Sequence, residues 1–250
     1  MSRPLAIVTG SSRGIGHAVT SELLDRGFDV LGIARSEPEG CSENDRYRHL
    51  GVDLSEPDAL ATVFDAELAA GLGLERRPRV GLVNNAATLD VASIAELEPR
   101  RLVKALTLNV AAPVQMYRFV LEHVPAATPL RIVDISSGAA TSAYPGWTAY
   151  CSSKAALDMA GQVLAAELDE SPALTGRNAS VCAYAPGVVA TSMQDEIRRA
   201  DEAAFPRRQR FIQLYEDGAL VDPRGPAHEI VELLLSESAP RFGRRRYSGN

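Results

Sequence analysis

The chain has little cysteine, no long apolar run and no recognisable leader sequence. Its three cysteines, Cys41, Cys151 and Cys182, are widely separated among 250 residues. A disulfide framework is therefore not expected. The sequence instead predicts a protein of the reducing cytoplasm. No stretch of the sequence is apolar for long enough to span a bilayer, so a membrane-spanning helix is not expected either.

Net positive charge is also lacking. The formal net charge is −6 at pH 7, so no overall field attracts nucleic acid or an anionic membrane, and neither is predicted as a partner. Two local arginine clusters, within 207–210 and 244–246, are either solvated faces or a site for an anionic substrate. The four histidines lack metal-ligand spacing, and no metal site is predicted. They are His17, His49, His123 and His228.

The composition is that of an ordinary soluble globular protein, with 46% hydrophobic and 23% charged residues. Linker candidates at 36–44 and 71–78 are short enough to be loops within one domain, residues 1–250. Strands are predicted near 4–9, 29–34, 46–52, 80–84, 130–136, 178–184 and 244–247, and helices near 14–26, 56–70, 97–123, 148–169 and 225–236. This alternation predicts a single-domain α/β fold of the Rossmann type: a doubly wound parallel sheet of about seven strands with helices on both faces.

One segment, 188–222, falls outside the alternation of strands and helices. It carries apolar side chains that include Met193, Phe205, Phe211 and Leu214. Two interpretations stay open: a substrate lid, or a pair of packing helices.

A glycine-rich turn follows the first predicted strand. Residues 9–16 read Thr-Gly-Ser-Ser-Arg-Gly-Ile-Gly, and a helical pattern begins there. Glycines let the backbone approach a pyrophosphate, whose charge the free amides at the start of a helix stabilise. The spacing is GxxxGxG and departs from the standard GxGxxG. The same residues satisfy GxSxG, the nucleophile elbow of a hydrolase with Ser12 as nucleophile, but that assignment leaves Tyr150 and Lys154 unused.

Tyr150 and Lys154 are four residues apart at the start of an alanine-rich helical stretch. Residues i and i+4 share a helix face, so the ammonium is expected beside the phenol, where it favours the ionised form and lowers the pKa of the tyrosine. A phenol with such a pKa donates a proton to a carbonyl or takes one from an alcohol. Alone, a YxxxK pattern more often marks an exposed helix face.

Five motifs stand in one order: the glycine turn, Asn84-Asn85-Ala86-Ala87, Ser136-Ser137, Tyr150-xxx-Lys154 and Pro186-Gly187. In this order and spacing the chain resembles the short-chain dehydrogenase/reductase family over residues 4 to 247. One departure is Ala87, where the family usually has glycine.

The resemblance implies roles for particular residues. Tyr150 is the expected proton donor, Lys154 lowers its pKa and binds the nicotinamide ribose, Ser137 (Ser136 less so) orients the substrate carbonyl, and Asn109 holds a water linked to the lysine. The implied cofactor-binding residues are Gly10, Ser12, Arg13, Gly14, Ile15, Gly16, Arg35, Asp53, Leu54, Asn85, Ala86, Ala87, Tyr150, Lys154, Pro186, Gly187, Val189 and Thr191.

Charge predicts which dinucleotide is used. An acidic residue after the second strand would bind the ribose hydroxyls and repel a 2′-phosphate. Here that strand is followed by Arg35, and Arg13 lies in the glycine turn. Two guanidiniums suit a phosphate, so NADP(H) is predicted. Asp53 resembles the acid that contacts the adenine; a helix N-cap is the alternative, which Ser55 could also provide.

Within the family, residues 186–194 and 218–223 look most like the sepiapterin reductase and benzil reductase branch. The chain ends without the acidic side chain that would hold a pterin, which favours a 1,2-dicarbonyl or similar small carbonyl substrate, reduced by NADPH. The alternatives are a pterin reductase, another short-chain alcohol dehydrogenase, or an NADP-binding regulatory protein. The small residues of 148–169 and the resemblance together predict a homodimer or homotetramer.

Overall fold

The strands and helices alternate along the chain in the computed structural model, which describes residues 2–41 and 43–249. Seven strands form one parallel sheet in the order β3-β2-β1-β4-β5-β6-β7. Their bounds are β1 Leu5–Thr9, β2 Asp29–Ala34, β3 Tyr47–Gly51, β4 Val80–Asn84, β5 Leu130–Ile135, β6 Ala179–Ala185 and β7 Phe242–Arg246. The predicted doubly wound sheet is confirmed, and each strand lies within a few residues of its predicted place.

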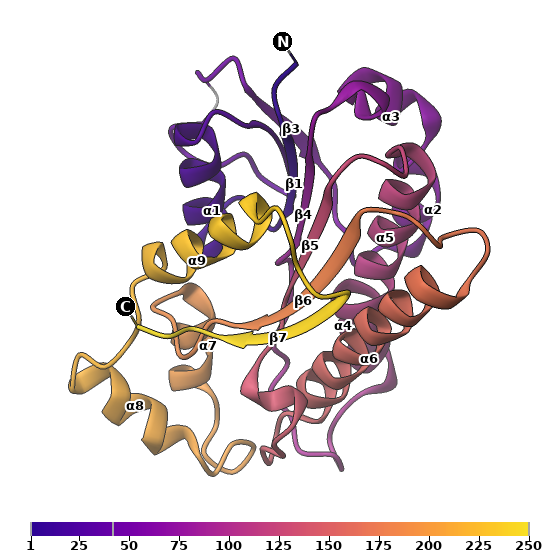
Figure 1. Cartoon of the computed structure of the whole chain (residues 1–250). Helices are drawn as coiled ribbons and strands as arrows, with labels where there is room; N and C mark the ends of the chain where they lie inside the picture. The colour runs from indigo at the N-terminus through magenta and orange to yellow at the C-terminus, as the bar shows by residue number, and fades with distance from the viewer. Residues whose placement is uncertain (1, 42, 250) are drawn as a thin grey trace.

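Helices cover both faces of this sheet. In Figure 1, α1 (Gly14–Asp25) and α9 (Arg224–Leu235) lie on one face. The other face carries α2 (Pro57–Val63), α3 (Ala66–Leu72), α4 (Pro99–Leu106), α5 (Ala112–His123) and α6 (Thr148–Glu170). Alternate residues of β1 point to opposite faces of the sheet. Leu5 and Ile7 belong to the buried cluster on one face, and Ala6 and Val8 to the cluster on the other.

Two predicted helices are divided. The stretch 56–70 forms α2 and α3, because Asp65 starts a new helix by accepting a hydrogen bond from Leu68 N (2.8 Å). The stretch predicted over 97–123 is helical from Pro99 and contains a π-helical turn at Thr107–Ala111. Pro113 has no N–H to donate to the carbonyl four residues before it, which is a physical reason for a wider turn there.

The segment 188–222 forms α7 (Ser192–Arg199) and α8 (Arg208–Glu216). An isolated bridge between Val189 and Val221 brings its ends together. Phe205 and Phe211 are buried against Trp147, with ring centroids 4.9 and 5.4 Å from that of the indole. The predicted helix pair is present, and it packs on the residues just before α6; its movement as a lid stays a prediction.

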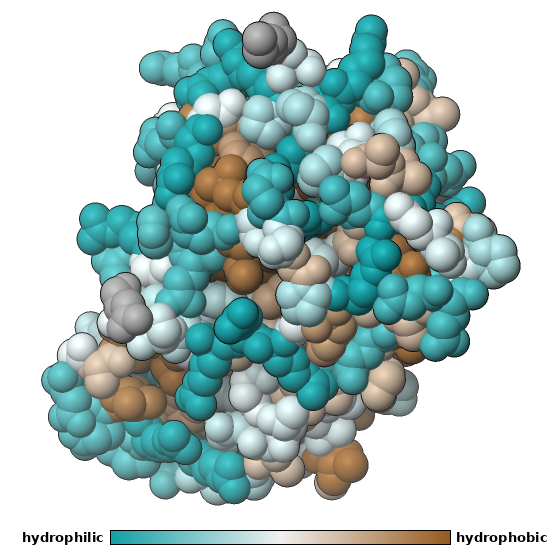
Figure 2. Space-filling view, viewed as in Figure 1, coloured by the Kyte–Doolittle hydropathy of each residue, from teal (hydrophilic) through white to brown (hydrophobic). Residues whose placement is uncertain are grey.

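The surface seen in Figure 2 is mostly hydrophilic, with separate small hydrophobic patches. Of the helices in the described part of the chain, none combines the length and the apolar composition that a bilayer crossing requires.

The turn between β1 and α1 needs its glycines. Gly10 and Gly14 have φ of +67° and +58°, a region that favours glycine. The Asn85 amide donates to the carbonyls of Thr9 (3.0 Å) and Gly10 (3.1 Å), which ties the end of β4 to the turn. Gly16 packs directly against these groups, and a Cβ on it would lie 2.2 Å from Gly10 O and 2.5 Å from Asn85 Nδ2.

Gly16→Ala is therefore expected to destabilise the fold by about 1–3 kcal/mol, the usual cost of overpacking, because backbone would have to move. Urea unfolding followed by circular dichroism measures the change. The control is Gly71→Ala in α3, where a Cβ would lie 3.8 Å from Arg48 Nη1, an ordinary contact. Equal stability of Gly16→Ala and wild type would contradict the proposed close packing.

Candidate active site

A groove of about 820 Å³ lies along the C-terminal ends of the strands and contains most of the predicted site residues. Ligands of open α/β sheets bind at this edge. The predicted residues that line the groove are Gly10, Ser12, Arg13, Gly14, Ile15, Arg35, Asp53, Leu54, Asn85, Ala86, Ala87, Ser137, Tyr150, Lys154, Pro186, Gly187, Val189 and Thr191. Gly16 and Asn109 are not lining residues, but they contact residues that are: Gly16 lies against Gly10 and Asn85, and Asn109 accepts a hydrogen bond from Thr88.

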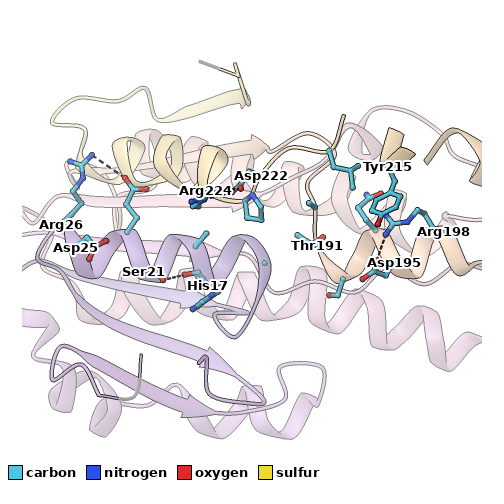
Figure 3. A pocket seen from close by; sticks show the side chains of 18 residues that line it. His17, Ser21, Asp25, Arg26, Thr191, Asp195, Arg198, Tyr215, Asp222 and Arg224 are labelled. Atoms are coloured by element: carbon cyan, nitrogen blue, oxygen red, sulfur yellow. Dashed lines mark hydrogen bonds and ion pairs between the residues drawn. The ribbon is translucent and has the colours of Figure 1, made fainter. Parts of the chain in front are cut away.

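A second cavity, of about 860 Å³, lies between α1, α7, α8 and the start of α9 (Figure 3). Four of its charged side chains form two ion pairs: Arg198 with Asp195, and Arg224 with Asp222. His17 lines this cavity, whereas Ser12 lines the groove. The hydrolase alternative requires a histidine beside Ser12, and this arrangement does not support it.

Tyr150 lies in the first turn of α6 with only 7% of its surface exposed. Its ring meets Trp147 edge to face at 5.7 Å between centroids. Burial raises the pKa of Tyr150 to about 12, and a hydrogen bond with Ser137 acts in the opposite direction. The phenol is thus protonated at neutral pH, as a proton donor must be.

Lys154 lies one turn further along α6 and is 2% exposed. Its Nζ donates to the carbonyl oxygen of Ile135 at 2.6 Å and lies 5.7 Å from the centroid of the Tyr150 ring. Burial lowers the pKa of Lys154 to about 8, while Asp134 and Asp158 act to raise it. The expectation that Lys154 lowers the pKa of Tyr150 is wrong for the chain alone, because burial raises this pKa and the opposing effect comes from the hydrogen bond with Ser137.

The two adjacent serines have different surroundings. Ser136 is buried and donates to Asp158 Oδ1 at 2.6 Å. Ser137 Oγ accepts a hydrogen bond from Ala139 N (3.1 Å), and its side chain is also hydrogen-bonded to that of Tyr150. Ser137 therefore lies beside the phenol, and its predicted role in orienting a substrate carbonyl stays a prediction.

Asn109 is buried in the π-helical turn. Its side chain accepts from Thr88 N (2.9 Å) and donates to Thr88 O (3.0 Å) and Ser153 Oγ (2.9 Å). It joins the chain after β4 to α6, so it holds the floor of the groove in place and does not line it.

The other end of the groove collects charged side chains. Arg35 and Asp53 lie together there, since Arg35 contributes to the lowered pKa of Asp53 after the larger effect of hydrogen bonding from Ser55. Asp53 Oδ1 accepts from Ser55 N (2.9 Å) and Oγ (2.7 Å). The N-cap of α2 is Glu56, so the alternative of a helix cap at Asp53 or Ser55 is wrong.

The middle of the groove suits a phosphate group. Helix α1 starts there at Gly14, and among the described residues no side chain caps its first amides. The positive end of the helix dipole and these amides bind anions, and the glycines leave the backbone uncovered. The residues present therefore fit a dinucleotide whose diphosphate lies at the start of α1.

Several lining residues carried no sequence motif. Tyr144, Trp147, Met193 and Phe211 form the apolar wall near Tyr150. Asp158 lies on the same helix face as Lys154 at spacing i+4, and that spacing was a signal that could have identified it.

Comparison with known proteins finds relatives that all belong to one family of enzymes. A model of the short chain dehydrogenase family matches residues 4–202. A benzil reductase ((S)-benzoin forming) from Bacillus cereus is 31% identical over 94% of this chain and 95% of its own length. A sepiapterin reductase from Xenopus laevis is 30% identical over 94% of this chain and 91% of its own.

Solved structures agree in fold. A short chain dehydrogenase/reductase from Saccharomyces cerevisiae superposes with a TM-score of 0.81 at 27% identity, over 99% of this chain and 96% of its own. The parallel sheet, the glycine turn and the groove with Tyr150 and Lys154 agree with these matches, and the chain belongs to the short-chain dehydrogenase/reductase family of oxidoreductases.

Proposed function

We propose that the protein is an NADPH-dependent carbonyl reductase whose substrate is a small 1,2-dicarbonyl compound. The observation that carries the proposal is one groove that is lined by the buried Tyr150 and Lys154, by the open start of α1 and by two arginines, Arg13 and Arg35.

The reaction needs a hydride on the carbonyl carbon and a proton on its oxygen. The bound cofactor supplies the hydride. Tyr150 donates the proton from its phenol, and Ser137 holds the carbonyl oxygen next to it. Lys154 contributes a positive charge that stabilises the phenolate left after proton transfer. Asn109 fixes the backbone behind the site.

The wall beside Tyr150 supports an aryl or otherwise flat apolar substrate. Trp147 stacks between Tyr144 (4.8 Å) and Phe205 (4.9 Å), and Phe211 tilts against it at 5.4 Å. Flat apolar groups bind well to such surfaces. Benzil, named for the Bacillus relative, is a dicarbonyl of this kind.

A pterin is the second candidate substrate, because the Xenopus relative is a sepiapterin reductase. Residues 247–250, which follow β7, read Tyr-Ser-Gly-Asn and contain no acidic side chain that could bind pterin nitrogens. A regulatory protein that binds NADP without turnover is the non-enzymatic alternative.

Incubation with NADPH and a panel of diketones, pterins and simple ketones separates the three alternatives. The compound that causes loss of nicotinamide absorbance is the substrate, and no loss with any compound favours the regulatory protein.

Tyr150→Phe tests the proton donor. The substitution removes the phenolic proton and keeps the ring, so kcat is expected to fall at least ~100-fold while NADPH still binds. Steady-state kinetics on the best dicarbonyl and fluorescence titration with NADPH give the two values. More than a tenth of wild-type turnover in the variant would contradict the role.

Arg35→Ala tests the choice of cofactor. A charge-assisted bond to phosphate contributes about 1.5–3 kcal/mol, so the loss of Arg35 should weaken NADPH binding about ten- to a hundredfold and leave NADH nearly unaffected. Arg13→Ala is expected to act in the same direction. Arg100→Ala, an exposed arginine paired with Glu98, is the matched control. Equal losses for both dinucleotides, or a wild type that prefers NADH, would contradict the assignment.

We also propose a cytoplasmic protein that works as a homodimer or homotetramer. Large hydrophobic side chains are exposed on three adjoining helices: Val103 on α4, Val114 on α5, and Met159 and Val163 on α6. Met159 and Val163 are four residues apart and share one face. Sedimentation equilibrium of the wild-type chain tests this, and a monomer at micromolar concentration would contradict it.

A further inference from the structure

Tyr150, Lys154 and Asp158 follow one another at intervals of four residues along α6. Asp158 is only 5% exposed and still touches the groove. The proposed reaction assigns it no role. A carboxylate so little exposed needs partners, and those of Asp158 connect it to two parts of the site.

The first connection is a hydrogen bond to the Ser136–Ser137 turn, which follows β5. Ser136 Oγ donates to Asp158 Oδ1 at 2.6 Å. Ser136 directly precedes Ser137, which bonds Tyr150. The carboxylate therefore fixes the end of β5 from which Ser137 extends. Arg244 on β7 approaches the other oxygen, with Nε 3.6 Å from Asp158 Oδ2.

The second connection is electrostatic and leads to Lys154. Two carboxylates, Asp134 on β5 and Asp158 on α6, raise the pKa of this lysine against the effect of burial. The ammonium itself donates to a neutral group, the carbonyl of Ile135. A buried ammonium without an anionic neighbour loses its proton easily.

The two carboxylates have different surroundings. Asp134 is completely buried, accepts from Asn84 Nδ2 (2.8 Å) and from the Tyr117 hydroxyl, and has a pKa raised by burial to about 6. On β6, Cys182 pairs with Val133 and so lies on the opposite face of the sheet, and burial raises the pKa of its thiol to about 11. Asp158 instead has a cation, Arg244, beside it and an edge on the groove.

We propose that Asp158 is a positioning residue of this active site, which keeps the buried ammonium of Lys154 charged and holds the Ser136–Ser137 turn in place. Both effects act through another residue, so Asp158 need not touch the substrate. The effect on the lysine is independent of the proposed function. The effect on turnover rests on it.

The chain allows a direct test, because Lys104 and Lys154 are its two lysines. Protein labelled with ε-¹³C lysine gives two NMR signals, of which the exposed Lys104 is an internal reference and Lys154→Met provides the assignment. Asp158→Asn keeps the shape and removes the charge. Each signal is followed as the pH is varied. In Asp158→Asn, the titration midpoint of Lys154 is expected to move down by about one pH unit, while the titration of Lys104 stays unchanged.

Asp169→Asn is the matched control, since Asp169 is on the same helix but pairs with Arg241 at the far end. It should leave Lys154 unchanged. Asp158→Ser, a smaller neutral replacement, is expected to act in the same direction and serves if Asp158→Asn does not fold. An unchanged Lys154 midpoint in a folded Asp158 variant would overturn the electrostatic part.

Ser136→Ala tests the effect of Asp158 on the Ser136–Ser137 turn separately from its effect on the charge of Lys154. It removes the bond to Asp158 and keeps the carboxylate, so turnover should fall about tenfold, a loss of roughly 1.4 kcal/mol, with the Lys154 midpoint unchanged. Wild-type turnover in Ser136→Ala would overturn the part that concerns the turn. A wild-type enzyme that reduces no carbonyl compound would contradict the proposed function and leave the lysine titration as a valid test.

Discussion

The active site depends on a positive charge that is kept inside the protein. Lys154 is only 2% exposed, although it lines the groove. Removing an ammonium from water costs several kcal/mol unless polar groups replace the solvent. The carbonyl of Ile135 and the carboxylate of Asp134, at the end of β5, and the carboxylate of Asp158, in α6, provide those groups.

This requirement explains why buried polar side chains gather at one edge of the sheet. Asp134 needs its own donors and finds them in Asn84 and Tyr117. Asp158 in turn bonds Ser136. The hydrogen bonds thus extend from β4 and α5 through β5 to α6, so the position of Lys154 is fixed by four separate parts of the chain.

The sequence predicted the sheet and the principal site residues because their signals are local. A buried strand is a short apolar run, and the glycine turn and Tyr150-xxx-Lys154 are continuous in sequence. The break at Asp65 and the π-helical turn before Pro113 were missed, since apolar periodicity continues through both. Propensity alone does not show where a helix changes its hydrogen bonding.

The surroundings of the site could not be predicted in the same way. The ring contacts of Phe205 and Phe211 with Trp147 join positions about sixty residues apart. The pKa of Tyr150 depends on how deeply α6 is buried, which spacing does not reveal. For this reason the predicted lowering of that pKa by Lys154 was wrong for the chain alone, whereas the pairing of the two residues was right.

The pH dependence of kcat/KM for NADPH in the wild-type enzyme tests the central claim most directly, since this parameter reports groups of the free enzyme. Lys154 has a pKa of about 8 and Tyr150 one of about 12. Loss of the lysine proton removes the charge, so kcat/KM should fall as the pH rises through about 8, while Tyr150 remains protonated. A value that stays constant to pH 10, or increases, would contradict a catalytic role for a buried, charged Lys154.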